Sequence, residues 1–418
     1  MRILHIITQK PNSTGSGVYM CGMINGFEKI GYNQAVIAGL NLGDDINCFS
    51  EKIPFYPVIY NTDTVPFPVV GMSDSMPYNS TKYRDLSVEM VKKLKLAFKN
   101  NIEKAVDEFK PDLIICHHLY LLTAFVREII KDIKIVGLCH GTCLRQLKTI
   151  DLEKDYIISN ISNLDIIFAL HDRQKEDIIK MFNIREDKVI VIGSGYNDNI
   201  FYDKKYKLDN RQINITFAGK ICKTKGLDSL IKSISRLNYP KDSIRLNIAG
   251  TGSDLKQNEE ILNTSKKCSF EIDFLGKLNQ NDLCDLFNKS HIFVLPSFYE
   301  GLPVVVLEAL ACGTEVITTD IDGVKHWMGD NINSSGKIEY IKLPKMKRQG
   351  IPFKNELNKF EDDLHESLNT RIENILNKYK EKKHVNMDDK TWDGLSLRIS
   401  KFIEVIANEE KKASVEEC

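Results

Sequence analysis

The sequence has no excess of charge of either sign. Its 418 residues include 57 lysine and arginine residues and 57 aspartate and glutamate residues, so the formal net charge is zero. A protein that binds nucleic acid or anionic lipid over a broad surface needs an excess of basic residues. The composition therefore argues against a nucleic-acid partner, and any anion-binding site must be local.

The sequence also lacks a long hydrophobic run. The most apolar stretch, residues 302–317, is interrupted by Pro303, Glu308 and Gly313, whereas a membrane-spanning helix needs about 20 apolar residues. The N-terminal residues 1–7 form a short apolar run without a cleavage site, so they predict a β-strand and not a signal peptide. We therefore expect a cytoplasmic protein.

The ten cysteines include no C-x-x-C pair. Cys116, Cys139 and Cys312 lie in apolar runs, where a thiol behaves as a small hydrophobic group. We expect these cysteines to be structural thiols in a reducing compartment, and we expect no zinc site.

Short β-rich runs alternate with segments of helical periodicity along the chain. This alternation predicts strand–helix–strand units, whose strands form parallel sheets. In the first half we expect strands at residues 2–8, 34–39, 113–116, 133–139, 166–169 and 189–192, and helices at about 17–30, 85–109 and 172–182.

A polar stretch without periodicity, residues 197–211, follows this first series and predicts a linker between domains. The series then restarts, which predicts two doubly wound α/β domains, residues 1–200 and 201–390. In the second we expect strands at 213–218, 245–249, 271–275, 292–295 and 315–317, and helices at about 227–237, 279–287 and 303–311.

The C-terminal part of the chain is less regular. Residues 342–352 carry a basic cluster without an evident purpose, and a charged helix is expected at about 360–380. The last segment, residues 391–418, predicts a helix that is capped at Thr391 and returns to the N-terminal domain. Its apolar side chains form one stripe that needs a packing partner: Leu395, Ile399, Phe402, Ile403 and Ile406.

The most informative segment is residues 296–317, in which a strand ends in a Pro-Ser turn and Gly-Leu-Pro opens a helix. Glu300 precedes this helix, where the backbone amides of Gly301 and Leu302 are free to bind a polar ligand. Glu308 lies inside the apolar helix, and a buried lone carboxylate is costly without a partner. Alternatively, Glu308 is a satisfied core acid and Glu300 a helix-start carboxylate.

With these residues, the chain resembles a retaining GT-B glycosyltransferase of family 4, also called group 1. Glu300 and Glu308 meet the E-x7-E pattern of that family. The resemblance extends from end to end and implies two Rossmann-like domains that face each other across a cleft. Its other marks are Gly15-Ser-Gly17-Val-Tyr, His140-Gly141, the run from Gly219 to Gly226, Ala249-Gly-Thr-Gly252 and Phe274-Leu-Gly276.

The resemblance implies a donor site in the second domain. Lys220 and Lys225 would meet the diphosphate, where the leaving group develops negative charge, although the family usually has arginine at position 220. Glu300, with the amides of Gly301 and Leu302, would hold the hexose, and Glu308 the ribose. Three glycines would approach the donor with their backbone: Gly219, Gly252 and Gly276.

The N-terminal domain would supply the remaining groups. Gly15, Ser16 and Gly17 form a loop that, by resemblance, meets donor diphosphate and acceptor, although alone they are a weak signal. His140 ends a strand, so its imidazole should point into the cleft, and the family places a histidine there beside the transferred sugar. His117 also ends a strand, and with the next residue, His118, it could line the acceptor side.

Two further features concern the acceptor. The polar segment 71–81 belongs to no predicted strand, and loops of this kind often bind the variable ligand. We expect Ser73, Asp74 and Tyr78 to face the acceptor. Lysines 92, 93, 95 and 99 on the following helix could contact anionic lipid, although a solvated face is the better explanation for them.

The sequence thus predicts transfer of a hexosyl unit from a nucleotide diphosphate sugar, most simply a UDP-sugar, in glycan or glycoconjugate synthesis. The acceptor would be a hydroxyl of a sugar, a lipid-linked molecule or another compound. Retention follows from the resemblance, and we expect neither a metal ion nor another cofactor. Two alternatives stay open: a sugar-nucleotide 2-epimerase on the same fold, and a non-catalytic nucleotide-sugar-binding protein.

Overall fold

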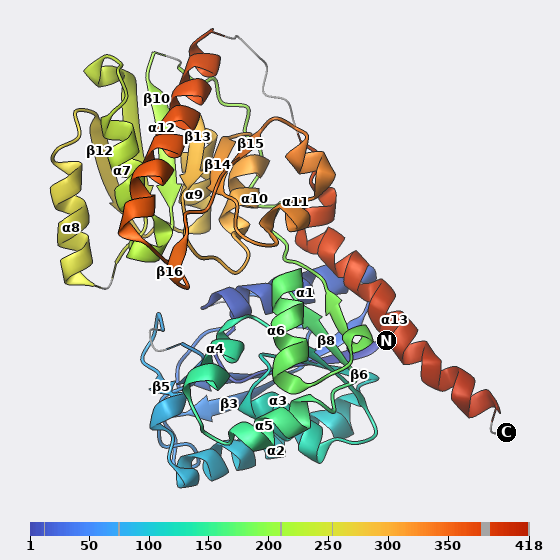
Figure 1. The fold of residues 1–418 in the computed structure, drawn as a ribbon. Coiled ribbons are helices and arrows are strands. Elements are labelled where there is room, and N and C mark those ends of the chain that lie inside the picture. Colours follow the sequence, from blue (N-terminus) through green and yellow to red (C-terminus); the bar gives the residue numbers. More distant parts are fainter. Residues whose placement is uncertain (12, 74–75, 210, 253, 378–384, 417–418) are drawn as a thin grey trace. The chain divides into compact units, whose positions relative to one another are not determined.

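The chain forms two compact units (Figure 1), in a computed structural model that describes residues 1–11, 13–73, 76–209, 211–252, 254–377 and 385–416. Unit 1 comprises Met1–Gly195 and Asp389–Cys418, and unit 2 comprises Tyr196–Asp388. Each unit has its own parallel sheet and its own hydrophobic core. No helix among the described residues is long and apolar enough to cross a membrane.

Unit 1 is built on a seven-stranded sheet in which every neighbouring pair is parallel. Six strands lie where the sequence predicts them, and the structure adds an edge strand at Phe55–Tyr60. Its third residue, Pro57, cannot donate to a ladder, and an edge strand tolerates this. The order is β3 (Phe55–Tyr60), β2 (Asn33–Asn41), β1 (Arg2–Ile7), β6 (Leu113–His117), β7 (Lys134–Leu138), β8 (Ile166–Ala169) and β9 (Val189–Val191).

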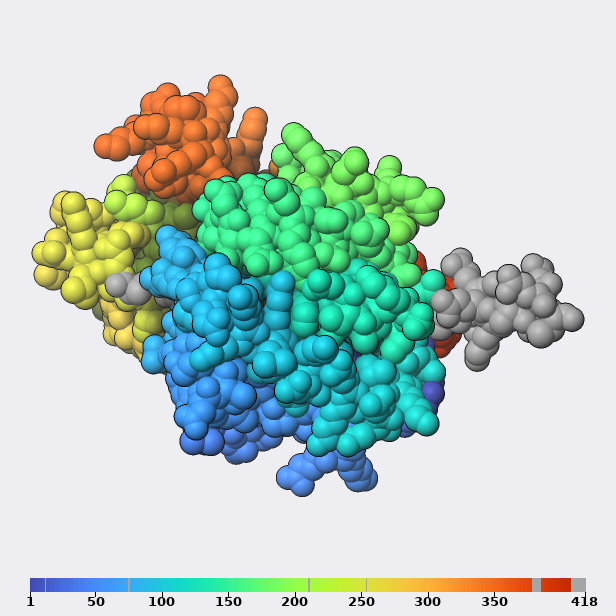
Figure 2. All heavy atoms as spheres, turned by 90° about the horizontal axis from the view of Figure 1, so that it is seen from below, coloured from blue at the N-terminus to red at the C-terminus, as the bar shows by residue number. Residues whose placement is uncertain are grey.

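Helices cover the sheet of unit 1. They are α1 (Gly15–Ile30), α2 (Val88–Phe109), α3 (Leu121–Ile129), α4 (Thr142–Thr149), α5 (Lys154–Ile161) and α6 (Asp172–Phe182). In the space-filling view of Figure 2, light-blue to teal atoms, which include those of α2 and α3, close over one side of this unit. The segment 71–81 was wrongly predicted to lie outside any strand, because the short parallel strands β4 (Val70–Gly71) and β5 (Thr81–Lys82) pair at its ends.

The final helix, α13 (Trp392–Glu416), packs on α1 of unit 1 as its apolar stripe requires. Two glycines of α1 make the close approach possible. A Cβ on Gly22 would lie 2.3 Å from the Trp392 indole, and one on Gly26 would lie 2.2 Å from Ser396 Oγ. Leu395, in the stripe of α13, is fully buried. The prediction that this helix returns to the N-terminal half is confirmed.

Unit 2 has a six-stranded sheet, again parallel throughout. Its order is β12 (Glu271–Gly276), β11 (Ile244–Ala249), β10 (Ile213–Ala218), β13 (Ile292–Leu295), β14 (Glu315–Thr319) and β15 (Ile338–Ile341). Its helices are α7 (Leu227–Ser235), α8 (Leu255–Ser265), α9 (Gln280–Asn288), α10 (Val304–Ala311), α11 (Val324–Asn333) and α12 (Lys354–Asn377). A hairpin of β16 (Met346–Arg348) and β17 (Ile351–Pro352) occupies the predicted basic cluster.

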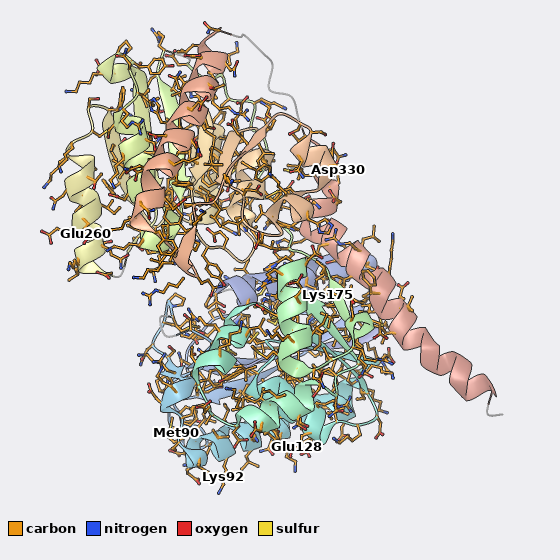
Figure 3. All side chains as sticks on the ribbon, in the orientation of Figure 1. Met90, Lys92, Glu128, Lys175, Glu260 and Asp330 are labelled. Atoms are coloured by element: carbon orange, nitrogen blue, oxygen red, sulfur yellow. A yellow bond between two sulfur atoms is a disulfide. The ribbon has the colours of Figure 1, made fainter. Side chains whose placement is uncertain are left out.

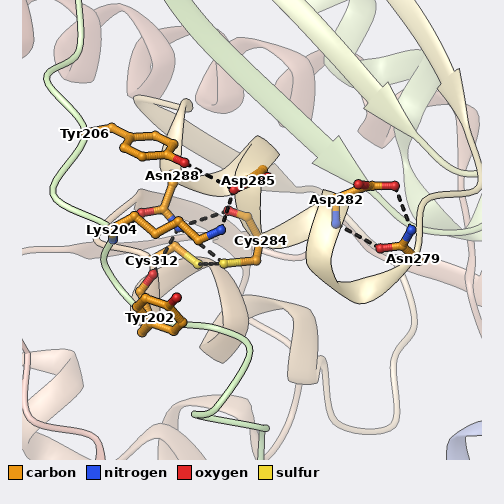
Figure 4. A network of polar contacts seen from close by, with 9 residues as sticks. All are labelled: Tyr202, Lys204, Tyr206, Asn279, Asp282, Cys284, Asp285, Asn288 and Cys312. Atoms are coloured by element: carbon orange, nitrogen blue, oxygen red, sulfur yellow. Dashed lines mark hydrogen bonds and ion pairs between the residues drawn. The ribbon is translucent and has the colours of Figure 1, made fainter.

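The segment predicted as a linker is packed onto unit 2. Phe201 is buried, and the fully buried Asn288 of α9 accepts a hydrogen bond from the Lys204 amide at 2.7 Å. The Asn288 amide group donates to the Tyr202 carbonyl at 3.0 Å and to the Cys284 carbonyl at 2.9 Å (Figure 4). Lys204 and Tyr206 also bond to Asp285 of α9 (Figure 4). The polar residues of this segment therefore bind it to the surface of unit 2, and it is not a free linker.

We expect Asn288→Ala to lower the free energy of unfolding by about 2–3 kcal/mol, because it leaves buried backbone groups unpaired. Asn279→Ala, which removes the exposed cap that accepts from the Asp282 amide at 2.9 Å, should cost only about 1 kcal/mol. Urea unfolding of both variants measures the difference. Equal losses would contradict the structural role of Asn288.

The prediction of structural thiols in a reducing compartment does not hold for two of the cysteines. Cys21 of α1 and Cys48, which follows β2, form a disulfide across 27 residues. Neither residue belongs to a spacing motif, so the pairing depends on how the chain brings α1 beside the segment after β2. Cys116 and Cys139 are free and buried, as predicted, and Cys312 is buried in the core of unit 2.

Candidate functional site

The carboxyl ends of three adjacent strands in unit 2 are joined by backbone hydrogen bonds. The Gly219 amide after β10 donates to the Ala249 carbonyl at 2.9 Å, and the Gly250 amide after β11 donates to the Gly276 carbonyl at 2.7 Å. A Cβ on Gly250 would lie 1.8 Å from the Gly219 carbonyl oxygen, so glycine is required there. Gly219 and Gly276, both predicted donor residues, thus lie in one connected set of loops.

Gly252 belongs to the same edge of the sheet. A Cβ on it would lie 2.1 Å from Asn258 Oδ1 and 2.7 Å from the Ile221 carbonyl oxygen. The Asn258 amide donates to the Gly252 carbonyl at 3.0 Å, while its buried Oδ1 accepts no hydrogen bond from a described residue. Asn258 could not be identified from the sequence, since an asparagine inside a helix carries no signal without its spatial neighbours.

An ion pair joins two of the predicted catalytic residues. Lys225 Nζ lies 2.5 Å from Glu300 Oε1 and 2.6 Å from Oε2, and Ser297 Oγ donates to the same carboxylate at 2.6 Å. The Phe298 amide donates to the Thr224 carbonyl at 2.8 Å, which ties the loop after β13 to the loop after β10. Two loops 75 residues apart in sequence thus hold a cation and a carboxylate side by side.

The other lysines of the loop after β10 behave differently. Lys220 is exposed and has no ion pair among the described residues, so its ammonium is available to a ligand. Lys223 lies 3.1 Å from Glu260, an exposed residue of α8 (Figure 3). The loop therefore contains three lysines in different settings: Lys220 has no ion pair in the part of the chain that the structure describes, Lys223 pairs with a carboxylate at the surface, and Lys225 pairs with Glu300 in the candidate site.

The start of α10 keeps two free amides. α10 begins at Val304, after Pro303 at its N-cap position, and no described residue accepts from the amides of Gly301 and Leu302. Gly301 is exposed, and a Cβ placed on it meets nothing within 4 Å. The amides that the sequence assigned to a polar ligand are therefore unoccupied by the chain.

Glu308 lies in the middle of α10 without a partner. No described residue forms a hydrogen bond or ion pair with its carboxylate. Burial raises the pKa of this carboxyl from 4.5 to about 7. A carboxyl that the fold leaves unsatisfied in an apolar helix is suited to accept hydrogen bonds from a ligand, and the interpretation of Glu308 as a satisfied core acid does not fit.

In unit 1, the N-terminus of α1 is organised by Gln9. The Gln9 side-chain amide donates to Thr14 Oγ1 at 2.8 Å and also to Ser16 Oγ. Thr14 caps the helix by accepting from the Gly17 amide at 3.2 Å. Gly15 is exposed with open space around its Cα, whereas Ser16 is buried and its hydroxyl is bound by Gln9. The prediction that Gly15, Ser16 and Gly17 form a loop is wrong, because they are the first three residues of α1. Of these three, the Gly15 backbone is the part open to a ligand.

Four histidines gather between the strands β1, β6 and β7 of unit 1. His117 Nδ1 lies 3.2 Å from His140 Nε2, with the rings stacked, and the His118 ring lies 4.8 Å from that of His140. The His5 ring lies 6.0 Å from His117. Burial, followed by the neighbouring histidines, holds the pKa of His117 and His140 well below 6.5, and burial lowers that of His5 to about 4.

We expect the imidazoles of His5, His117 and His140 to stay neutral through the range around pH 6.5 in which an ordinary histidine gains a proton, since the fold penalises their charged forms. The unfolded chain binds protons on these groups below about pH 6.5, so stability should fall as the pH falls through this range. NMR titration of the ring signals, assigned with His140→Gln, tests this. Three midpoints near 6.5 would contradict it.

The predicted acceptor loop also contacts Gln9. The Met72 amide donates to Gln9 Oε1 at 3.4 Å, and Gln146 donates to the Met72 carbonyl at 3.0 Å. Ser73 is half-buried, and Asp74 lies outside the described residues. Lys10 Nζ lies 4.8 Å from the centre of the Tyr78 ring, and burial raises the pKa of the Tyr78 hydroxyl. The sequence analysis missed Gln9 and Gln146, whose roles depend on long-range packing.

The lysines proposed to contact lipid do not form a free basic face. Lys95 pairs with Glu153 at 3.2 Å, and Lys99 lies 3.6 Å from Glu103. Lys92 is exposed at the surface of α2 (Figure 3). The structure therefore gives lipid contact at α2 no support beyond isolated lysines.

Within the described ranges, no three His, Cys, Asp or Glu side chains are arranged to hold a metal ion.

Comparison with known families gives two adjacent matches. Residues 198–338 match the family described as glycosyl transferases group 1, and residues 77–199 match glycosyltransferase family 4. An uncharacterized glycosyltransferase of Methanocaldococcus jannaschii is 27% identical over 281 residues, which is 62% of this chain and 68% of that protein. A D-inositol 3-phosphate glycosyltransferase of Corynebacterium aurimucosum is 24% identical over 268 residues, 58% of this chain and 64% of that protein.

Solved structures share the fold over nearly the whole chain. The sucrose-phosphate synthase of Thermosynechococcus elongatus has a TM-score of 0.63 at 14% identity and covers 97% of this chain and 98% of its own. Anabaena HepE, in complex with UDP and glucose, has a TM-score of 0.60 at 13% identity and covers 97% and 100%. The chain thus spans about two thirds of the length of the curated relatives but nearly all of these structures.

Proposed function

Because this chain belongs to the group 1 glycosyltransferases and has their GT-B fold, we propose that it transfers a hexosyl unit from a nucleotide diphosphate sugar to a hydroxyl acceptor. The observation that carries the proposal is the Lys225–Glu300 pair, held at 2.5 Å beside the connected strand ends of unit 2. UDP is the proposed nucleotide of the donor, and the structure of HepE with UDP and glucose supports this choice.

The proposed donor site lies in unit 2. Lys220 and Lys225 would meet the diphosphate, because fixed positive charge stabilises the charge that develops on the leaving group. Glu300 and the free amides of Gly301 and Leu302 would bind the hexose hydroxyls, and Glu308 would accept from the ribose. Gly219, Gly252 and Gly276 would allow close approach of the backbone.

Unit 1 would supply the acceptor side. The Gly15 backbone at the start of α1 and the neutral imidazole of His140 are the proposed contacts to the donor phosphate and the transferred sugar. The half-buried Ser73 and Tyr78 would lie toward the acceptor, which could be a sugar or a lipid-linked molecule.

We propose that the reaction retains the anomeric configuration by displacement on one face of the sugar. The bond between the anomeric carbon and the donor phosphate oxygen breaks, the acceptor oxygen forms the new bond, and its proton passes to a donor phosphate oxygen. No protein nucleophile or metal ion takes part in this scheme. A fixed lysine beside the phosphate supplies the stabilisation that the departing diphosphate requires.

A thermal-shift screen of UDP-, GDP- and ADP-sugars tests the donor, because a ligand that binds the folded chain raises its apparent stability by mass action. We expect the UDP-sugar to give the largest shift. NMR of UDP-N-acetylglucosamine with enzyme alone separates the alternatives. Epimerisation at C2 would identify an epimerase, and binding without slow hydrolysis or transfer to any acceptor would identify a non-catalytic binding protein.

A further inference from the structure

The β16–β17 hairpin carries positive charge that the chain does not neutralise. No acidic residue occurs between positions 342 and 355. The five cations of this segment are exposed, and within the described part of the chain none of them pairs with a carboxylate: Lys342, Lys345, Lys347, Arg348 and Lys354.

Several cations elsewhere in unit 2 are paired with carboxylates, as two arginines show. Arg371 bonds to Glu315 at 3.0 Å and to Glu339 at 2.9 Å. Arg245 pairs with Glu271 at 2.5 Å. Among the residues that the structure describes, unpaired lysines such as Lys220 also occur elsewhere in this unit, but the hairpin segment holds five unpaired cations with no carboxylate among them, although the whole chain has no net charge.

The hairpin is fixed against the loops that carry the candidate site. Its strands pair at Met346 and Pro352, and its turn contains Gly350 at a φ of 72°, which favours glycine. A Cβ on Gly350 would lie 3.0 Å from Thr224 Cγ2 and 3.2 Å from Tyr299 Cβ. These two residues directly precede Lys225 and Glu300 in sequence. Figure 1 shows β16 at the lower edge of unit 2.

The hairpin turn thus lies beside the two loops that hold the Lys225–Glu300 pair. Exposed charges act over a Debye length of about 8–10 Å, so we expect the hairpin cations to attract an anion bound near this pair. The proposed diphosphate contacts are Lys220 and Lys225, on a different loop. The hairpin cations are thus additional to those that a nucleotide diphosphate needs, and they are suited to oxyanions.

We propose that the hairpin is a second anion-binding site, which binds a phosphoryl or carboxylate group carried by a substrate beside the hexose. This inference rests on the proposed function, because it assumes that the hexose lies at Glu300. The anion could belong to the donor, as a carboxylate on the transferred sugar, or to the acceptor, as a phosphoryl group.

Calorimetric titration of the full chain with matched probes tests the proposal. The donor arm compares UDP-glucuronic acid with UDP-glucose, and the acceptor arm compares glucose 6-phosphate with glucose in the presence of saturating UDP. The variant is Lys347→Gln with Arg348→Gln. The control, Lys266→Gln with Lys267→Gln, makes the same charge change just after the end of α8 (Leu255–Ser265), where both lysines are exposed and unpaired among the described residues.

The control lies away from the site because α8 follows β11 and runs back along the sheet, so its end is at the opposite edge from the strand carboxyl ends. We expect the hairpin variant to weaken one anionic probe about tenfold or more, with UDP itself changed by less than about threefold. The control should leave all constants unchanged. The arm that loses affinity identifies the source of the anion.

The proposal is overturned if the hairpin variant binds both anionic probes as tightly as the wild type does. It is equally overturned if the wild type prefers neither anionic probe over its neutral counterpart. Failure of the proposed function gives a different result, because the wild type would then neither transfer the donor sugar nor hydrolyse it slowly, whichever probes the hairpin variant binds.

Discussion

Replacing Lys225 with alanine should lower the rate of sugar transfer by about 10²–10³-fold, because it removes a fixed positive charge from the proposed position of the leaving group. The ammonium is held in place before any ligand arrives, at 2.5 Å and 2.6 Å from the two oxygens of Glu300. Its side chain is 21% exposed, so the charge is screened less than that of a surface lysine. Steady-state transfer, or slow donor hydrolysis where no acceptor is known, measures the effect.

The matched control is Lys223→Ala, two residues earlier on the same loop. Lys223 pairs with Glu260 on the surface, with 65% and 47% of the side chains exposed. Such pairs contribute about 0–1 kcal/mol to stability, so the Lys223→Ala variant should stay folded. Because Lys223 is not a proposed contact of the diphosphate, turnover should stay within about twofold. Thermal unfolding of both variants checks that they are folded. Near-normal turnover in folded Lys225→Ala would refute the assignment of Lys225 to the phosphates.

Elements whose pattern is local could be predicted from the sequence. The β-rich runs of both sheets, the cap at Thr391 and the apolar stripe of α13 are all encoded in neighbouring residues. The edge strand β3 was missed because Pro57 interrupts its pattern. The packing of α13 on α1 depends on Gly22 and Gly26, whose close contact with Trp392 and Ser396 no local pattern reveals.

In the candidate site, too, residues in local motifs could be predicted, whereas contacts between distant segments could not. Lys225 and Glu300 were identified because each lies in a motif between a predicted strand and the following helix, and Glu308 because it is a lone carboxylate in an apolar helix, eight residues after Glu300. The ion pair between Lys225 and Glu300 was not predicted, since it depends on β10 and β13 being neighbours in the sheet. The unsatisfied Asn258 likewise becomes meaningful only beside Gly252.

Replacing Glu308 with glutamine should stabilise the chain without ligand and weaken UDP binding, and both effects should depend on pH. In the folded chain the Glu308 carboxyl has a pKa of about 7, against an ordinary value of 4.5. Between these values the folded state retains a proton that the unfolded state has released, so stability falls as the pH rises. The loss is complete above pH 7 and amounts to about 3 kcal/mol.

Glutamine keeps the shape of the side chain but cannot ionise. Glu308→Gln should therefore match the wild type near pH 4.5 and exceed its free energy of unfolding by up to about 3 kcal/mol at pH 8. Urea unfolding at several pH values measures this. Glu259→Gln, a change of an exposed residue of α8, is the control and should show no gain. The absence of a pH-dependent gain in Glu308→Gln would show that the carboxyl is not penalised by burial.

Measurements of UDP binding test the proposed role of the Glu308 carboxylate in ligand recognition. A ligand hydroxyl donates to the ionised carboxylate, so UDP affinity of the wild type should rise between pH 6 and 8 by more than that of Glu308→Gln. Titration of the ligand phosphate affects both proteins equally and cancels in this comparison. At pH 8 the variant should lose about 10–100-fold in UDP affinity, as expected for hydrogen bonds to a charged group. Unchanged UDP affinity would show that Glu308 does not bind the ribose, and its unpaired, buried carboxylate would then have no ligand to explain it.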